Sequence, residues 1–205
     1  MAKSFLSNAY TLDGPEAVTG FYQDWAASYD AEIEQNGYAT PRRCAEALGA
    51  LAGDLDAPVL DLGCGTGLSG LALRAAGFTC IDGVDVSAAM LEHAHSREGV
   101  YRSLIETSIG APLPAQPGAY AHVNAAGVIS PDHAPEDTID EVLGLLPVGG
   151  CLVFSLNDHA LEDAAFPGKV AEVVTAGHAD LAFDEYGDHL PGIGLKARVY
   201  GLRKR

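Results

Sequence analysis

The chain is short of positive charge. Its 205 residues carry 12 Lys and Arg against 28 Asp and Glu, which gives a formal net charge of −16. Such a surface repels phosphate backbones and anionic lipid headgroups, so we expect no nucleic acid and no membrane as partner. A small ligand that is neutral or cationic suits this balance better.

Metal-ligand spacings and long apolar runs are lacking too. The four cysteines, at positions 44, 64, 80 and 151, form neither a CxxC pair nor a zinc-ligand rhythm, so we expect reduced thiols and no bound metal. No stretch approaches the roughly 18 apolar residues of a membrane span, and the first residues lack the apolar run of a signal peptide. These absences predict a cytoplasmic protein.

What the chain does have is a regular alternation of short apolar runs and helical stretches after residue 56. Strands are predicted at residues 58–62, 79–85, 101–108, 119–125, 151–156, 180–184 and 195–202, and helices at 68–76, 88–95, 136–146 and 164–176. This alternation predicts an α/β fold, a doubly wound, mostly parallel sheet of seven strands. The last two strands are separated only by the turn-rich residues 187–194, so we expect them to pair antiparallel.

With no linker or repeat, residues 1–205 are predicted to form a single domain, with a helical segment at 1–56 and the core at 57–205. In the first part, Pro15 can open a helix, and residues 42–48 have the pattern of another. Between them, residues 21–30 concentrate four aromatic residues, Phe21, Tyr22, Trp25 and Tyr29, in a segment that forms either a lid or an outer layer.

A glycine loop follows the first predicted strand. Gly63, Gly65 and Gly67 alternate between that strand and the next helix, where a missing Cβ permits a tight turn and lets a ligand lie against backbone. Asp85 ends the second strand, 22 positions after Gly63, where a carboxylate can accept hydrogen bonds from both hydroxyls of a ribose. Loop and acid together predict a nucleoside site.

Two cofactor classes contain such a nucleoside. A GxGxxG pattern occurs at residues 65–70, but Gly63 already occupies the place directly after the strand, where the dinucleotide fingerprint has its first glycine. Asp61 at the strand end would be poorly placed beside a pyrophosphate and suits a ligand with an ammonium group. A nicotinamide-dependent reductase is therefore the less favoured class.

The segments Val59 to Gly67 and Gly83 to Ser87 resemble the first two motifs of class I S-adenosylmethionine-dependent methyltransferases. Similarities to later motifs extend the resemblance over about residues 21 to 157. Trp25-x-x-x-Tyr29-Asp30 and Gly-Val-Asp-x-Ser are similar to the Williams–Beuren-region methyltransferase-like proteins. The resemblance implies a Rossmann-like methyltransferase that converts S-adenosyl-L-methionine to S-adenosyl-L-homocysteine.

The resemblance also implies site residues. The loop with Gly63, Cys64, Gly65 and Gly67 would hold the methionine part, with Asp61 near its ammonium, and Asp85 followed by Val86 would bind the ribose. Thr107 and Ser108 stand where many members carry an acidic residue that faces the adenine amine, so that contact depends on a hydroxyl here. Asn124, at the end of the fourth strand, is either a contact to cofactor or acceptor or an ordinary strand-end cap.

Methyl transfer needs an in-line approach and the exclusion of water, and it requires no dedicated base. Where a base helps, His133 is the best-placed histidine, although a loop histidine is commonly just an exposed polar residue. His159, His178 and His189 are each expected at the surface. Trp25 and Tyr29, four residues apart, would share one helix face and either close over the sulfonium or pack on the domain edge.

The sequence thus predicts a methyltransferase for an unidentified small-molecule acceptor, with no statement on oligomeric state. A second reading is a protein of the same fold that binds a nucleoside and methylates nothing, since fold alone does not decide function. The third is the nicotinamide-dependent reductase.

Overall fold

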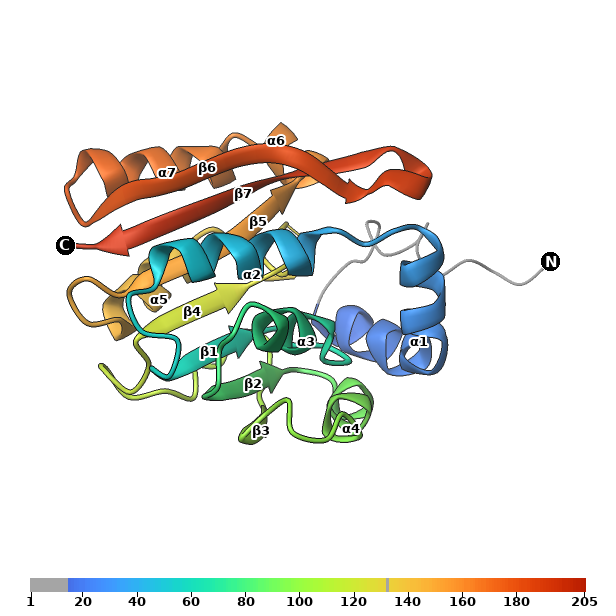
Figure 1. The fold of residues 1–205 in the computed structure, drawn as a ribbon. Helices are drawn as coiled ribbons and strands as arrows, with labels where there is room; N and C mark the ends of the chain where they lie inside the picture. Colours follow the sequence, from blue (N-terminus) through green and yellow to red (C-terminus); the bar gives the residue numbers. More distant parts are fainter. Residues whose placement is uncertain (1–14, 132) are drawn as a thin grey trace.

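A seven-stranded sheet with the order β3-β2-β1-β4-β5-β7-β6 carries the fold (Figure 1). The computed structural model describes residues 15–131 and 133–205. The strands are β1 (Val59–Leu62), β2 (Ile81–Asp85), β3 (Ser103–Glu106), β4 (His122–Ala125), β5 (Cys151–Asn157), β6 (Ala179–Leu190) and β7 (Leu195–Lys204). β1 to β5 pair in parallel, whereas β7 runs antiparallel to both β5 and β6. The predicted fold class and the antiparallel last pair are confirmed.

Helices cover both faces of this sheet (Figure 1). They are α1 (Pro15–Gln35), α2 (Thr40–Leu51), α3 (Leu68–Ala75), α4 (Ala88–His95), α5 (Thr138–Leu145), α6 (Asp158–Glu162) and α7 (Ala165–Thr175). One core cluster joins the sheet to α5 and α7, and a second joins it to α2 and α3. Since β1, β4 and nearly all of β5 are buried, their residues are mostly apolar on both faces, as a central parallel strand requires.

Helix α1 lies across the carboxyl ends of the parallel strands, beside α4 (Figure 1). Its Asp30 accepts a hydrogen bond from Thr66 Oγ1 at 2.5 Å in the glycine loop and pairs with Arg97, which follows α4. Arg97 Nε also donates to the Thr66 carbonyl at 2.6 Å. The helix predicted to open at Pro15 is thereby attached to the loop beneath it.

The C-terminal hairpin differs from its prediction. β6 continues to Leu190, well past the predicted end at residue 184, so the segment between the two strands shrinks to a short 3-10 helix, Pro191–Ile193, and Gly194. Two irregularities, at Leu181/Phe183 and Asp188/Leu190, let the strand keep its pairing with β7 through its polar residues. Pairing with β7 here outweighs the turn-forming residues at 187–190. The short helix α6 was not predicted either.

Arg43 on α2 holds this hairpin from inside. Its guanidinium donates to the carbonyl oxygens of Glu185 at 2.9 Å, Asp188 at 2.9 Å and Ala197 at 3.0 Å, and only 8% of the residue is exposed. A Cβ at Gly187 would lie 3.0 Å from Arg43 Nη2. The guanidinium therefore satisfies backbone acceptors that the irregular strand leaves open.

We predict that Arg43→Met lowers the free energy of unfolding by about 2–4 kcal/mol, because the carbonyls it leaves buried lose their donor. Urea unfolding followed by circular dichroism measures this loss. Arg42→Met is the matched control: Arg42 is exposed and makes only a surface pair with Glu46, so its removal should cost less than about 1 kcal/mol. Equal losses for the two variants would contradict the structural role of Arg43.

Candidate active site

The glycine loop leaves β1 as a tight turn that only glycine allows at its first position. Gly63 has φ +63°, and a Cβ there would lie 2.1 Å from Val128 Cγ2, so a side chain at this point would collide with the loop that follows β4. At Gly65 a Cβ would meet nothing within 4 Å. The backbone at Gly65 is therefore open to a ligand.

Asp85 at the end of β2 is bound to this loop. Its carboxylate accepts the Gly65 N–H at 2.8 Å and the Ser87 N–H at 2.9 Å. Burial raises the pKa of Asp85, and these two backbone donors oppose the shift. Strand β2 and the glycine loop are thus joined at the point where a ribose was predicted.

Asp61 lies in a closed network behind the loop. It is 0% exposed, and its oxygens accept hydrogen bonds from Ser69 Oγ at 2.6 Å, Tyr101 Oη at 2.7 Å and Asn124 Nδ2 at 2.8 Å. Burial raises its pKa to about 6 despite these donors. Within the described part of the chain, the buried Oδ1 of Asn124 has no hydrogen-bond partner.

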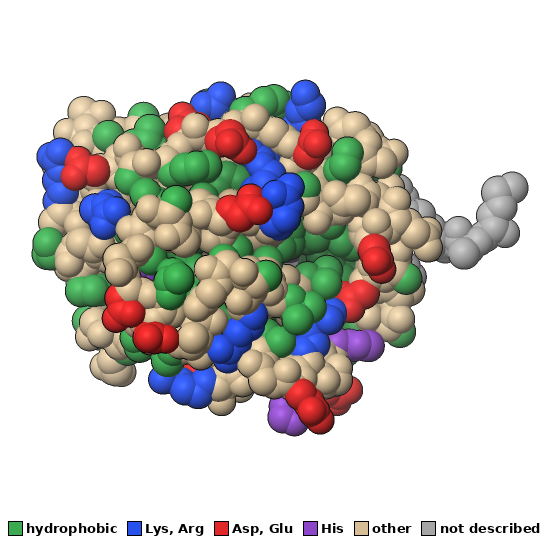
Figure 2. All heavy atoms as spheres, viewed as in Figure 1, with side chains coloured by type: hydrophobic (Ala, Val, Ile, Leu, Met, Phe, Trp, Pro, Cys, Tyr) green, Lys and Arg blue, Asp and Glu red, His purple; other side chains and the backbone are tan. Residues whose placement is uncertain are grey.

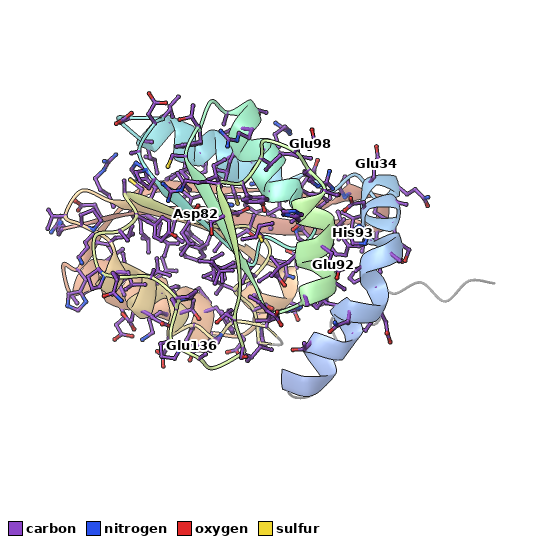
Figure 3. All side chains as sticks on the ribbon, turned by 90° about the horizontal axis from the view of Figure 1, so that it is seen from below. Glu34, Asp82, Glu92, His93, Glu98 and Glu136 are labelled. Atoms are coloured by element: carbon purple, nitrogen blue, oxygen red, sulfur yellow. The ribbon has the colours of Figure 1, made fainter. Side chains whose placement is uncertain are left out.

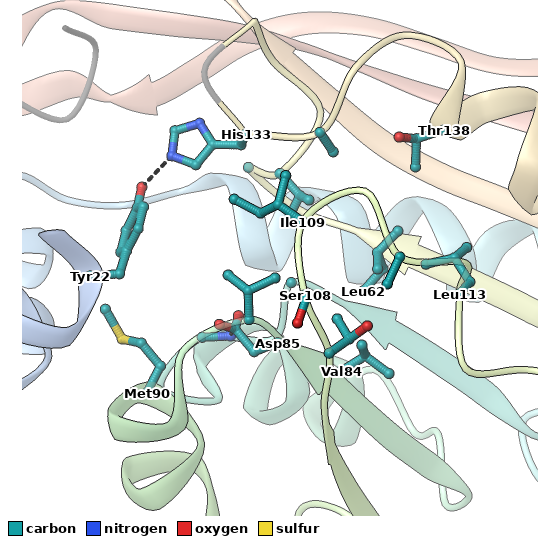
Figure 4. A pocket seen from close by; sticks show the side chains of 18 of the residues that line it. Tyr22, Leu62, Val84, Asp85, Met90, Ser108, Ile109, Leu113, His133 and Thr138 are labelled. Atoms are coloured by element: carbon teal, nitrogen blue, oxygen red, sulfur yellow. Dashed lines mark hydrogen bonds between the residues drawn. The ribbon is translucent and has the colours of Figure 1, made fainter. Parts of the chain in front are cut away.

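A cavity of about 560 Å³ opens at the carboxyl ends of β1, β2, β3 and β4 (Figure 4). Its walls come from α1 and the turn after it, the glycine loop, the segments that follow β2, β3 and β4, and the start of α5. They include Tyr22, Tyr29, Tyr38, Gly63, Gly65, Asp85, Val86, Met90, Thr107, Ser108, Ile109, Gly127, Val128, His133, Asp137 and Glu141. A smaller chamber of about 40 Å³, also lined by the three tyrosines, Gly127 and His133, adjoins it.

A hydrogen bond joins the two sides of the cavity mouth. Tyr22 Oη on α1 lies 2.7 Å from His133 Nε2 on the loop after β4, and His133 Nδ1 lies 2.7 Å from Ser130 Oγ (Figure 4). The Tyr22 and His133 rings are in contact, with centroids 5.3 Å apart. The bond holds α1 over the cavity.

The aromatic residues of α1 form one cluster. Trp25 stacks on Tyr22 at 5.8 Å and meets Tyr29 edge-on at 4.7 Å between ring centroids. Trp25 itself is 1% exposed, and its indole N–H donates to Glu32 at 2.9 Å. Tyr22 and Tyr29 line the main cavity, whereas Trp25 supports them from behind and reaches only the smaller chamber.

The structure brings most of the predicted site residues together. Those on the cavity wall are Tyr29, Gly63, Gly65, Asp85, Val86, Thr107, Ser108 and His133. Those that do not line it are Trp25, Asp61, Cys64, Gly67 and Asn124. Cys64 is buried with its Sγ against Gly83, and Gly67 caps the start of α3 below the Arg97 side chain.

Several cavity residues were not predicted as site residues, and the tyrosines Tyr22 and Tyr38 are the most prominent of them. Tyr22 lies seven residues before Tyr29, two helical turns on the same face, and that spacing was the available signal. Tyr38 follows α1 in a turn, and a Cβ at Gly127 would lie 2.3 Å from its hydroxyl oxygen. No pattern in the sequence links Tyr38 to a glycine so far along the chain.

The expectation that His189 lies at the surface is wrong. It is 4% exposed, its Nδ1 lies 2.7 Å from Thr40 Oγ1, and burial lowers its pKa to about 4, so the imidazole is neutral. It is buried because β6 runs on to the turn between α1 and α2, where His189 contacts Tyr38 and Thr40. His159 and His178 are exposed as expected. His93 on α4 is exposed as well, next to Glu92 (Figure 3).

Metal ligands do not gather in the described part of the chain: no group of three or more His, Cys, Asp or Glu side chains there is arranged to hold an ion. None of the described helices is long and apolar enough to cross a membrane. Asp85 and Gly65 lie on one cavity wall in an α/β sheet with this strand order, which is the arrangement predicted for a nucleoside site.

Comparison with known proteins gives the class of this domain. Residues 59–150, from β1 to the turn before β5, match the family model described as a methyltransferase domain. With the relatives and solved structures described next, this match confirms the predicted resemblance to S-adenosylmethionine-dependent methyltransferases.

Two similar proteins support this relationship. Methyltransferase-like protein 27 of Homo sapiens is 37% identical over 146 residues, 69% of this chain and 59% of that protein. An 18S rRNA (guanine-N(7))-methyltransferase of Bos taurus is 36% identical over 91 residues, 44% of this chain and 30% of that protein. The chain thus spans less than two thirds of the length of either relative.

A solved structure agrees in fold. It is the 1,6-didemethyltoxoflavin-N1-methyltransferase of Burkholderia thailandensis, with bound 1,6-didemethyltoxoflavin and S-adenosylhomocysteine. It superposes with a TM-score of 0.67 at 19% identity and covers 94% of this chain and 91% of that chain. The Rossmann-like methyltransferase fold is thereby confirmed.

The raised pKa of Asp61 predicts a defined pH dependence of stability. Its folded-state pKa of about 6 exceeds the ordinary value of 3.8, so the folded state holds the proton more tightly than the unfolded state. The contribution of Asp61 to stability should therefore fall as pH rises from about 4 to 6 and stay constant above that range.

Asp61→Asn removes this titration. We expect the unfolding free energy of the natural protein, measured relative to the variant by urea titration, to decline between pH 4 and pH 6 and then to level off. Taking the difference between the two proteins cancels the titration of the other carboxylates. A difference that is flat over this range would contradict the assignment.

Proposed function

We propose that the protein is an S-adenosyl-L-methionine-dependent methyltransferase whose acceptor is a small molecule. The observation that carries the proposal is the position of Asp85 and Gly65 on the wall of one cavity, within a domain that matches methyltransferases. The solved neighbour from Burkholderia thailandensis, whose structure contains S-adenosylhomocysteine, has the same fold.

The residues present fit this cofactor. Asp85 can accept hydrogen bonds from ribose hydroxyls, and Gly65 leaves room for a ligand against its backbone. Thr107 and Ser108, after β3, supply hydroxyls on the adenine side of the cavity wall. Asn124 has a buried Oδ1 without a partner among the described residues, but it does not line the cavity, so it is not counted among the contacts to the cofactor.

When bound, S-adenosylmethionine supplies a methyl group on a positively charged sulfur. The chain then has two tasks, to hold the acceptor in line and to exclude water. Helix α1 and the Tyr22–His133 hydrogen bond cover the cavity and serve the second task. His133 lines the cavity and can take a proton from an acceptor hydroxyl or amine.

The two alternatives fit less well. A nicotinamide enzyme is disfavoured because residues 59–150 match a methyltransferase domain. A binding protein without activity would be favoured by a blocked crevice, but a cavity of about 560 Å³ extends from the glycine loop to His133. An accessible cavity of this kind supports catalysis.

A small acceptor is favoured over a nucleic acid, although one relative is named for its action on rRNA. The net charge of −16 opposes phosphate binding, and on the face in Figure 2 the Lys and Arg side chains are scattered among acids rather than gathered in one patch. The cavity wall, as far as the structure describes it, contains neither Lys nor Arg.

Calorimetric titration with S-adenosylmethionine, S-adenosylhomocysteine and NAD tests the cofactor. We expect micromolar binding of the first two and none of NAD. Asp85→Asn should weaken binding of S-adenosylhomocysteine by about 1–3 kcal/mol, because one oxygen that accepts hydrogen bonds becomes a donor.

Asp184→Asn is the matched control, because Asp184 pairs with Arg198 on the C-terminal hairpin and does not line the cavity. It should leave the affinity unchanged. Binding of NAD alone would overturn the proposal, and equal affinities of the Asp85 variant and the natural protein would remove Asp85 from the site.

A second prediction concerns His133 as the base that takes a proton from the acceptor. On the first acceptor that the natural protein methylates, His133→Gln should lower kcat by about 10²- to 10⁴-fold while the affinity for S-adenosylhomocysteine stays within a factor of a few. His178→Gln, an exposed position outside the cavity, is the control and should retain the full rate. An unchanged rate for His133→Gln would exclude it as the base.

A further inference from the structure

We propose that the tyrosine-lined end of the cavity takes an amine as its methyl acceptor, and that Tyr22 receives the amine. The inference rests on the proposed function and goes beyond it by naming the acceptor class. It depends on three features of the described residues, namely the aromatic surface, the charge of the wall and the hydrogen-bonded chain from Tyr22 to Ser130.

The first feature is the concentration of aromatic rings at one end of the cavity. Tyr22, Tyr29 and Tyr38 line both the main cavity and the chamber of about 40 Å³, and Trp25 closes that chamber from behind. All of these rings come from α1 or the turn after it. Aromatic faces carry partial negative charge and attract an ammonium group within about 6 Å of the ring centroid.

The second feature is the charge of the wall. No described Lys or Arg lines either the main cavity or the smaller chamber, so an acceptor carboxylate or phosphate would find no counter-ion there. Asp137 and Glu141 line the main cavity near α5, where Asp137 pairs with Lys169 Nζ at 2.9 Å and Glu141 accepts the Leu113 N–H at 2.7 Å. The wall therefore favours a cation and penalises an anion.

The third feature is a path for the proton. In the tautomer with its proton on Nδ1, His133 donates to Ser130 Oγ and accepts the Tyr22 hydroxyl at Nε2. A hydroxyl oxygen that donates its own proton is also an acceptor, and in this role the Tyr22 oxygen would receive an N–H of the acceptor. An ammonium has no lone pair, so the acceptor must first give up one N–H proton. That proton passes to the Tyr22 oxygen as the tyrosine proton moves to His133, which becomes an imidazolium. The freed nitrogen lone pair would then form the N–C bond as the methyl–sulfur bond of the cofactor breaks and its electron pair remains on the sulfur.

Three probes that share one ring and differ in the end group test the preference: 2-phenylethylamine, 2-phenylethanol and 3-phenylpropionate. Each is titrated calorimetrically into the protein saturated with S-adenosylhomocysteine. We expect the amine to bind at least 10-fold more tightly than the alcohol and the carboxylate not to bind. Equal binding of the carboxylate or the alcohol, or no binding of any probe up to about 10 mM, would overturn the proposal.

The role of Tyr22 is tested by Tyr22→Phe, which keeps the ring and removes only the hydroxyl. The Kd of the amine should rise about 5- to 10-fold, while that of S-adenosylhomocysteine should change less than 2-fold. Tyr186→Phe is the matched control: this tyrosine lies on β6, bonded to Asp158 and outside both chambers, and neither Kd should change. An unchanged amine Kd in Tyr22→Phe would remove Tyr22 from the acceptor site.

The proposed function fails separately, when S-adenosylhomocysteine itself does not bind. In that case the three probes are titrated into the cofactor-free protein. Their order of affinity then decides the preference of the tyrosine-lined end on its own.

Discussion

Burial of the Asp61 carboxylate is the constraint on which the site depends. A charge with no exposed surface is tolerated only where donors surround it, and here the donors come from α3, from the segment before β3 and from β4. β1, α3, β4 and Tyr101 are thereby fixed relative to one another, and the glycine loop begins one residue after β1. The shape of the loop follows from this arrangement as much as from its glycines.

The same principle explains how the loop and α1 are held. Asp85 takes two backbone N–H groups at the end of β2, and Asp30 takes the Thr66 hydroxyl and the Arg97 guanidinium above the loop. Three acidic residues, Asp61, Asp85 and Asp30, thus fix the glycine loop and the elements around it through their hydrogen bonds. In a protein with a net charge of −16, these carboxylates are partnered individually, which limits their mutual repulsion.

Much of the sheet was predictable from the sequence because each buried strand is a short apolar run between turn signals, and the loop with Asp85 could be placed from spacing alone. The length of β6 was not predictable, because its polar residues are kept in a strand by β7 and by the buried Arg43. Nor was the burial of His189, which depends on contact with α2. Asp61 was predicted near the ligand, yet hydrogen-bond donors from three other parts of the chain enclose it. No local sequence pattern predicts these three contacts.

Helix α1 is attached to the rest of the domain through a few side chains. Substitutions on this helix can therefore be separated from substitutions around the glycine loop. The residues predicted to face the nucleoside lie at or just after the ends of β1, β2 and β3, whereas the aromatic rings at the other end of the cavity come from α1 and the turn after it. Substitutions of these aromatic residues can therefore change the shape of that end while the glycine loop and Asp85 stay as they are. Under the proposed function, the acceptor side of the cavity can vary separately from the cofactor side.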